Sequence, residues 1–253
     1  MLLNVENLEK EFEGLTALRE VSFDVEPGGI TGIIGPNGAG KTTLFNVISG
    51  HLPPTHGRIF LESRDITGFP AHRIASLGLS RTFQNVRPFR DMTVLENVLT
   101  GLHAGPTDGL VSASLRLPGL VRREQRKIRE VYHILEMLNL EKDWDKGAQS
   151  LPFGPLRLLE IARALAAKPR ILLLDEPAAG LNRTETSSLA KILKRINQKG
   201  ITILLVEHDM RLVMGIVQYV IVLDAGRIIA RGSPDEIRHN PDVIRAYLGD
   251  REI

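Results

Sequence analysis

The sequence of 253 residues contains no cysteine, which excludes disulfide bonds, thiolate metal sites and cysteine nucleophiles. No apolar run approaches the roughly 18 residues of a membrane span, and the first residues lack the basic segment and long apolar core of a secretory signal. Any membrane association is therefore expected to come through a partner. Basic and acidic residues almost cancel, 32 against 30, so the formal net charge of +2 predicts no nucleic-acid partner.

A phosphate-binding loop is the strongest feature that the chain does contain. An apolar run at 30–34 leads into the spacing G-x-x-x-x-G-K-[ST], and a helical stretch at 44–48 follows, with Gly50 as its predicted stop. Glycines let consecutive backbone N–H groups curl around an anion, while the positive end of the helix points at the same place. A glycine-rich turn that only joins a strand to a helix is the alternative, which the lysine, the threonine and the spacing disfavour. The residues expected to contact the nucleotide are Gly35, Pro36, Asn37, Gly38, Ala39, Gly40, Lys41, Thr42 and Thr43.

Four side chains in and beyond this loop carry the predicted chemistry. Lys41 is expected to reach the outer phosphates of ATP or GTP, and the Thr42 hydroxyl is the natural ligand for the accompanying Mg²⁺. Asp175 and Glu176 follow the apolar run 171–174, at the carboxyl end of a strand, where ligands bind in open α/β sheets. Asp175 is predicted to hold Mg²⁺ through water, and Glu176 to act as the general base. Without the phosphate loop, such a pair of acids would simply indicate a solvated loop.

Two further polar side chains are candidates for the same site. His208 follows the apolar run 201–206, so its imidazole is predicted to hydrogen-bond the terminal phosphate at the same edge of the sheet. Gln84 follows Arg81-Thr82-Phe83, and its amide is predicted to touch the metal or its water. The alternatives are a structural or merely exposed histidine and a glutamine that only fills the surface.

Hydrophobic periodicity predicts both kinds of sheet. Alternating apolar and polar residues over 5–25 predict antiparallel strands at the start of the fold. The almost wholly apolar runs 171–174 and 201–206 are typical of buried parallel strands. Between those runs, Asn182 and Glu185 have the spacing of a capping box, so a helix is predicted to connect the two strands.

The middle of the chain has a different pattern. Residues 85–165 carry apolar residues at helical spacing and a stretch rich in glycine, proline and serine. They are therefore predicted to form an inserted helical subdomain, whereas residues 1–84 and 166–253 form an α/β core with an antiparallel subdomain and a C-terminal tail.

These motifs occur in the order found in ABC-transporter ATPase subunits, and the chain resembles that family over nearly its whole length. The resemblance is carried by the phosphate loop, Gln84, the segment 151–165, Leu174-Asp175-Glu176-Pro177, Ala179-Gly180-Leu181-Asn182 and His208. Within the family the chain is most similar to the ATPases of branched-chain amino-acid importers. That narrower likeness rests on the runs at 32–40, 81–84, 92–98 and 206–210 and on the tail at 240–248.

The resemblance implies a P-loop NTPase (RecA-like) core with an antiparallel β subdomain and an inserted α-helical subdomain, and it implies hydrolysis of ATP with Mg²⁺. Two such ATPases would close over two ATP molecules and drive permease subunits at the cytoplasmic face of the membrane, with an extracytoplasmic solute-binding protein as an indirect partner. Phe12 matches the aromatic residue that stacks on adenine, although it could instead be part of the core. Asn182 falls in the loop that contacts the opposing site. The groove near Gln84 to Arg90 would take a coupling helix of the permease.

The chain departs from the family in the signature segment. The family pattern is Leu-Ser-Gly-Gly-Gln, whereas this chain has Leu151, Pro152, Phe153 and Gly154. Pro152 has neither the hydroxyl that the family offers to the partner's γ-phosphate nor an N–H, while Gly154 still offers its N–H. A hydrogen bond to a charged group is worth roughly 1.5–3 kcal/mol, so its loss would weaken closure by about one to two powers of ten.

This departure leaves several assemblies and functions open. A heterodimer with a different ATPase that carries an intact signature is expected, and a homodimer that closes through Gly154 and the helix dipole is the alternative. A nucleotide-dependent clamp with weak hydrolysis is a second function. A soluble ABC ATPase that acts on nucleic acid or ribosomes is a third, but the sequence has neither the long coiled coil nor the tandem cassettes typical of that class.

Overall fold

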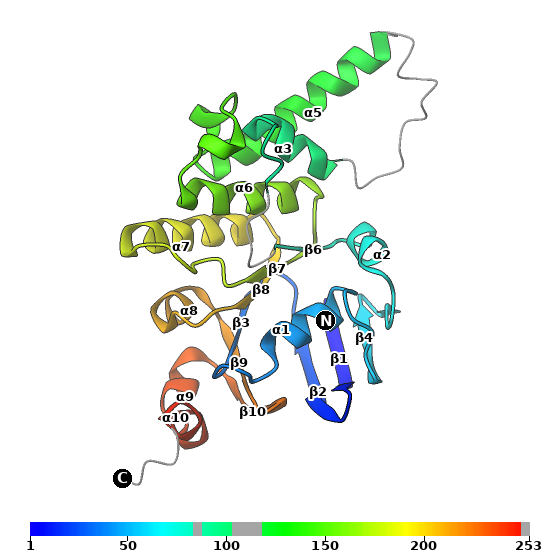
Figure 1. Ribbon diagram of the computed structural model, residues 1–253, viewed down its shortest axis with the longest axis vertical. Coiled ribbons are helices and arrows are strands. Elements are labelled where there is room, and N and C mark those ends of the chain that lie inside the picture. Colours follow the sequence, from blue (N-terminus) through cyan, green and yellow to red (C-terminus); the bar gives the residue numbers. More distant parts are fainter. Residues whose placement is uncertain (83–87, 103–117, 249–253) are drawn as a thin grey trace.

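The computed structural model describes residues 1–82, 88–102 and 118–248, with the side chains of 118–123 left out of the description. These residues form two β-sheets and the helices around them (Figure 1), so the predicted mixed α/β class is confirmed. The strands are β1 (Leu3–Phe12), β2 (Leu15–Val25), β3 (Ile30–Ile34), β4 (His56–Leu61), β5 (Arg64–Asp65), β6 (Leu79–Arg81), β7 (Ile171–Asp175), β8 (Thr202–Val206), β9 (Tyr219–Asp224) and β10 (Arg227–Gly232). The helices are α1 (Lys41–Ile48), α2 (Ala71–Ser76), α3 (Val94–Gly101), α5 (Pro118–Met137), α6 (Phe153–Ala166), α7 (Arg183–Gln198), α8 (Met210–Ile216), α9 (Pro234–Arg238) and α10 (Pro241–Leu248), with short 3₁₀ turns at Glu141–Asp143 and Ala148–Ser150.

The larger sheet places the carboxyl ends of several strands side by side. Within the described residues its order is β10-β9-β3-β8-β7-β6, and its pairs are parallel except for the antiparallel edge strand β10. Every residue of β3, β7 and β8 is buried, because helices or the smaller sheet cover both faces. The register pairs Asp175 with Val206 and Ile33 with Val206. The residues that follow these strands therefore emerge at one edge of the sheet.

The smaller sheet is antiparallel, as the alternating pattern predicts. Its order is β2-β1-β4-β5 among the described residues, and β1 and β2 form a hairpin in which Phe12 pairs with Leu15. Leu3 and Phe23 from this sheet share a buried cluster with Phe45 of α1 and Leu173 of β7. Helix α1, which follows the phosphate loop, therefore packs between the two sheets.

The opposite face of the larger sheet packs on helices. Leu172 and Leu174 of β7 point to the face away from Leu173, into a second cluster with residues of α3, α5, α6 and α7. Figure 1 shows α3, α5 and α6 together at one end of the molecule, and in the chain they lie between β6 and β7. The helical character predicted for 85–165 therefore holds where the structure describes it. Helix α6, the last of these helices, ends at Ala166.

Helix boundaries follow the caps in the sequence. The predicted capping box at the start of α7 is confirmed, because Asn182 Oδ1 accepts the N–H groups of Thr184 and Glu185 while the Glu185 carboxylate accepts the N–H of Asn182. The predicted stop at Gly50 is also confirmed, since α1 ends at Ile48 and Gly50 has a φ of 73°. In the parts of the chain that the structure describes, no helix has the length and apolar character to cross a membrane.

Candidate functional site

The phosphate loop lies between β3 and α1, and two of its glycines are required by close backbone contacts. A Cβ at Gly35 would collide with the carbonyl oxygen of Leu223, and one at Gly40 would lie 2.7 Å from the carbonyl oxygen of Ala17. Gly40 is also the N-cap of α1, and its φ of 100° is unfavourable for any residue that has a side chain. The loop can therefore pass directly beneath β9 and β2, and it aims the free N–H groups at the start of α1 into the space above it.

The Lys41 side chain crosses the inside of this loop. Its Nζ donates hydrogen bonds to the carbonyl oxygens of Gly35 at 2.7 Å and Pro36 at 2.8 Å, and the residue is only 8% exposed. Burial lowers the pKa of Lys41, and the nearby carboxylates of Glu176 and Asp175 oppose that effect. The Lys41 ammonium group therefore lies near two carboxylates and hydrogen-bonds two loop carbonyls. An anion bound over the loop would replace these carbonyls as its partner.

A pocket of about 580 Å³ lies over the loop. Phe12 is 40% exposed on its rim, so the alternative that Phe12 is ordinary core is wrong. Lys10 Nζ lies 5.0 Å from the centroid of the Phe12 ring, on an aromatic face that an adenine base would also suit. Among the described residues, the lining of this pocket is Phe12, Leu15, Thr16, Ala17, Arg19, Asn37, Gly38, Ala39, Gly40, Lys41, Thr42, Thr43, Glu176, Ala225 and Gly226.

Glu176 enters this pocket from a strained backbone position. Its φ is 47°, a left-handed conformation that is uncommon for a residue with a side chain. Its N–H donates to the carbonyl oxygen of Val206 at 2.9 Å, which ties the end of β7 to the end of β8. Strain of this kind persists only where the surroundings impose it, and it is concentrated at functional sites.

His208 and Glu207 follow β8 beside Glu176. His208 Nδ1 lies 3.9 Å from Glu176 Oε2, and the imidazole is 64% exposed. Glu207 is fully buried: its Oε1 accepts the N–H of Ala178 at 2.7 Å, and its Oε2 accepts the N–H groups of His208 at 3.0 Å and Asp209 at 3.3 Å. One carboxylate therefore joins the loop that carries Glu176 to the loop that carries His208.

Asp175 lies beneath this pocket rather than in its lining. Its Oδ2 accepts a hydrogen bond from Arg81 Nη2 at 2.8 Å, and the two side chains are 3% and 5% exposed. Thr42, by contrast, faces the pocket at the start of α1. A hydroxyl and a carboxylate, with phosphate oxygens and water, form the oxygen-donor set that Mg²⁺ prefers, so these residues fit that ion. Gln84 lies outside the described residues.

The signature segment forms the start of α6, away from the phosphate loop. Pro152 is the N-cap of α6, and Phe153 is 46% exposed with its ring against Gly180. Gly154 is buried, because a Cβ there would lie 2.8 Å from Glu185 Oε1 in the capping box of α7. The structure thus brings Gly154 near Asn182. Leu151 to Gly154 and Asn182 are absent from the described lining of the loop pocket.

Comparison with known proteins agrees with this geometry. A family model described as ABC transporter matches residues 18–179. The chain belongs to the ABC transporter family. A second model, described as branched-chain amino acid ATP-binding cassette transporter, matches residues 227–253. The predicted family and the predicted class of enzyme, an ATPase of this family, are confirmed.

Curated relatives cover almost the whole cassette. The high-affinity branched-chain amino acid transport ATP-binding protein LivG of Escherichia coli strain K12 is 45% identical over 250 residues, 98% of each chain. BraF of Pseudomonas aeruginosa, with the same description, is 44% identical over 250 residues, again 98% of each chain. A probable branched-chain amino acid transport ATP-binding protein LivG of Archaeoglobus fulgidus is 40% identical over all of this chain and 98% of its own.

Solved structures show the same cassette. A nucleotide-free ATP-binding cassette from an ABC transporter aligns with a TM-score of 0.85 at 36% identity, over 98% of this chain and 99% of that chain. The ADP conformation of an ATP-binding cassette of an ABC transporter gives 0.86 at 35% identity with the same coverage. The predicted P-loop NTPase fold is therefore confirmed.

The sequence interpretation missed the side chains that hold Asp175 in place. Arg81 Nη1 donates to Asn46 Oδ1 at 2.8 Å and to Ser49 Oγ at 2.9 Å, while its Nη2 binds Asp175. Burial lowers the pKa of Arg81, and Asp175 opposes that effect. An arginine in the short strand between Leu79 and Thr82 was the available signal, because a buried cation needs a carboxylate partner.

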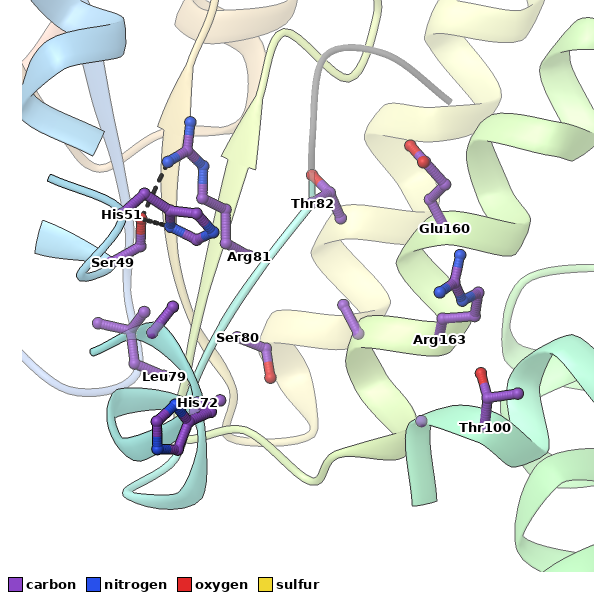
Figure 2. Close-up of a pocket in the computed structure, with 14 residues that line it drawn as sticks. Ser49, His51, His72, Leu79, Ser80, Arg81, Thr82, Thr100, Glu160 and Arg163 are labelled. Atoms are coloured by element: carbon purple, nitrogen blue, oxygen red, sulfur yellow. Dashed lines mark hydrogen bonds between the residues drawn. The ribbon is translucent and has the colours of Figure 1, made fainter. Parts of the chain in front are cut away.

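A second pocket, of about 370 Å³, opens between the large sheet and the helices that follow β6 (Figure 2). Ser49, His51 and Arg81 cluster on its sheet side, and Glu160 and Arg163 reach into it from α6. Arg163 also stacks over Phe89, with its guanidinium carbon 4.7 Å from the ring centroid. The pocket thus has a mixed polar lining contributed by both the sheet and the inserted helices.

Proposed function

We propose that this cassette is the ATP-hydrolysing subunit of an importer of branched-chain or other amino acids, and that it works as a peripheral protein at the cytoplasmic face of the cell membrane. The observation that carries the ATPase part of the proposal is that Lys41 and Glu176 line one pocket, with His208 Nδ1 3.9 Å from Glu176 Oε2. The amino-acid part is supported by the relatives LivG and BraF, branched-chain amino acid transport ATP-binding proteins that match 98% of this chain, and by the family model matched at the C-terminus.

The proposed chemistry uses the side chains in the loop pocket. Lys41 exchanges its loop carbonyls for the outer phosphate oxygens of ATP, and the amides at the start of α1 bind the same anion. Phe12 stacks on adenine. A Glu176 carboxylate oxygen takes the proton of the attacking water, while His208 donates a hydrogen bond to the terminal phosphate.

Thr42 and Asp175 are the residues that we propose to hold Mg²⁺, with Asp175 acting through water and Gln84 contributing its amide oxygen. When bound, Mg²⁺ would neutralise charge on the phosphates. Because Arg81 already occupies Asp175 Oδ2, the other carboxylate oxygen is the one that we propose to face the ion's water.

The pocket of Figure 2 is our proposed docking site for the permease. It lies where the large sheet meets the inserted helices, and Arg81 and Thr82 line it. Its polar groups, among them His72, Glu160 and Arg163, suit a segment that presents both charges and hydrogen-bonding groups.

We propose that the cassette pairs with a different ABC ATPase that carries an intact signature. Pro152 offers neither a hydroxyl nor an N–H at the N-cap of α6, and Gly154 is buried against Glu185 in the isolated chain. The site over Lys41 and Glu176 would be completed by the partner's serine, and the reciprocal site would be weak.

Reconstitution tests the proposal. The cassette, its permease and the second ATPase are placed in vesicles, and ATP turnover and uptake of labelled leucine are measured. Glu176→Gln is expected to bind a fluorescent ATP analogue normally and to lose turnover and uptake by about 10²–10⁴-fold. Lys41→Ala is expected to lose binding as well.

Glu6→Gln on the exposed side of β1 is the matched control and should behave as the wild type. Normal turnover in Glu176→Gln would contradict the assignment of the base. A cassette that hydrolyses ATP with no uptake of any amino acid would contradict the transport function, and binding without turnover in the full complex would favour the clamp.

A further inference from the structure

Arg81 and Asp175 form a buried ion pair directly under the nucleotide site. They end the neighbouring parallel strands β6 and β7, in a register that pairs Arg81 with Leu173. The Arg81 Nη2 to Asp175 Oδ2 distance is 2.8 Å, with side chains only 5% and 3% exposed. Because a buried carboxylate pinned by one guanidinium nitrogen has few other positions available, Arg81 determines where the Asp175 carboxylate points.

The second terminal nitrogen of Arg81 holds the helix that carries the phosphate-binding residues. Nη1 donates to Asn46 Oδ1 at 2.8 Å within α1 and to Ser49 Oγ at 2.9 Å at its C-cap. Helix α1 begins at Lys41 and Thr42. One planar guanidinium therefore spans the end of β7 and the body of α1, and its rigid fork links their relative positions.

The hydrogen bonds continue outward to the surface. Ser49 Oγ carries one hydrogen, which its 2.6 Å contact gives to the carbonyl oxygen of Phe45, so it accepts from both Arg81 and His51 Nδ1 at 2.9 Å. His51 is exposed and lines the pocket of Figure 2 together with Ser49 and Arg81. Direct hydrogen bonds through Ser49 and Arg81 thus connect His51, in that pocket, to Asp175.

We propose that Arg81 is a positioning residue for Asp175, and that Ser49 and His51 make the position of that carboxylate depend on what occupies the pocket of Figure 2. The occupant is a polypeptide segment of the permease, so this part of the inference rests on the proposed function. A segment that displaces His51 shifts Ser49 Oγ, and the Arg81 fork carries the shift to Asp175 and α1.

The first test uses the purified cassette alone. The Mg²⁺ concentration that gives half-maximal binding of a fluorescent ATP analogue is measured for the wild type and for Arg81→Lys, which keeps the charge but loses the fork. Residues that orient a metal ligand typically change metal affinity by 10–100-fold, so a rise of about tenfold is expected. Arg81→Lys with a native circular dichroism spectrum and a half-saturation within about twofold of wild type would overturn the positioning role.

If Arg81→Lys does not fold, Ser49→Ala decides the same question, because it removes only the hydroxyl that anchors Nη1. A smaller rise of about threefold is expected for it, since Asn46 still holds that nitrogen. An unchanged Mg²⁺ requirement in a folded Ser49→Ala would overturn the proposal in that case.

The second test measures how far the permease stimulates ATP turnover in vesicles. Stimulation is expressed as the ratio of turnover with the permease to turnover of the same variant without it, and His51→Ala is expected to lose at least half of it. His72→Ala is the comparison variant, since His72 lines the same pocket from α2 outside this set of hydrogen bonds, and it is expected to lose less of the stimulation than His51→Ala. Equal losses in the two variants would overturn the link to the pocket. If the permease does not stimulate the wild type, the proposed function fails, and the Mg²⁺ measurements alone decide the role of Arg81.

Discussion

Replacing Glu207 with glutamine is expected to destabilise the cassette by loosening the two loops that carry Glu176 and His208. The carboxylate accepts three backbone N–H groups, from Ala178, His208 and Asp209, at 2.7, 3.0 and 3.3 Å, in a fully buried position. Glutamine offers one oxygen, so an NH₂ group must face at least one of these donors in either orientation.

The size of this effect follows from the hydrogen bonds. A buried donor left without an acceptor costs about 1–3 kcal/mol, so Glu207→Gln is expected to lose about 2 kcal/mol. For a chain of this size, that loss corresponds to a fall in Tm of roughly 4–8 °C. Turnover should fall more than nucleotide affinity, because the change separates Glu176 from His208 and leaves the phosphate loop intact.

Thermal melts followed by circular dichroism measure the stability, and hydrogen exchange at the amides of Ala178 and His208 locates the change. Glu6→Gln, the same substitution on an exposed strand position, is the control and should melt within about 1 °C of wild type. If Glu207→Gln also melts within that range and those amides exchange no faster, then the Glu207 carboxylate does not hold the two loops together.

The remaining predictions concern the partner ATPase and pH. Pro152→Ser restores a hydroxyl at the N-cap of α6, so ATP turnover of the cassette without a partner ATPase is expected to rise by about one to two powers of ten. Brisk turnover of the wild type alone, unchanged by this substitution, would contradict the asymmetric pair. Partial burial of the imidazole and the adjacent Arg81 lower the pKa of His51 below its ordinary 6.5, so the unfolded chain binds the His51 proton more readily than the folded chain. The stability contributed by neutral His51 is therefore complete above pH 6.5. It is lost as the pH falls below 6.5 and through the lowered pKa of His51 in the folded chain. Melts on both sides of 6.5 should show a smaller acid destabilisation in His51→Gln than in the wild type, and equal slopes would refute this assignment.

Short-range signals predicted most of the fold. The capping box of Asn182 and Glu185, the stop at Gly50 and the buried strands after residues 170 and 200 depend on residues within a few positions of one another, and the structure has all of them. The helical region was predicted where its apolar spacing is regular, and its boundary at residue 165 stays a prediction, because helix ends carry a weaker signal.

The candidate site was only partly accessible to sequence reasoning. Lys41 and Glu176 were predicted from motifs, and the structure brings them to one pocket. The ties of Arg81 to Asp175 and of Glu207 to Ala178 were not predicted, because they join residues 94 and 29 positions apart. Such contacts depend on which strands are neighbours and in which register.

By itself, the sequence determined the chemistry that this chain can perform: a glycine loop with its lysine and threonine, two acids after an apolar strand, and a proline where the family has a serine. Each of these depends on residue type and local spacing, which the sequence states directly. Only the tertiary structure decided how those groups are held. The order and register of the parallel strands bury Arg81 against Asp175 and connect that pair to His51, because side chains from distant segments meet only once the sheet has formed.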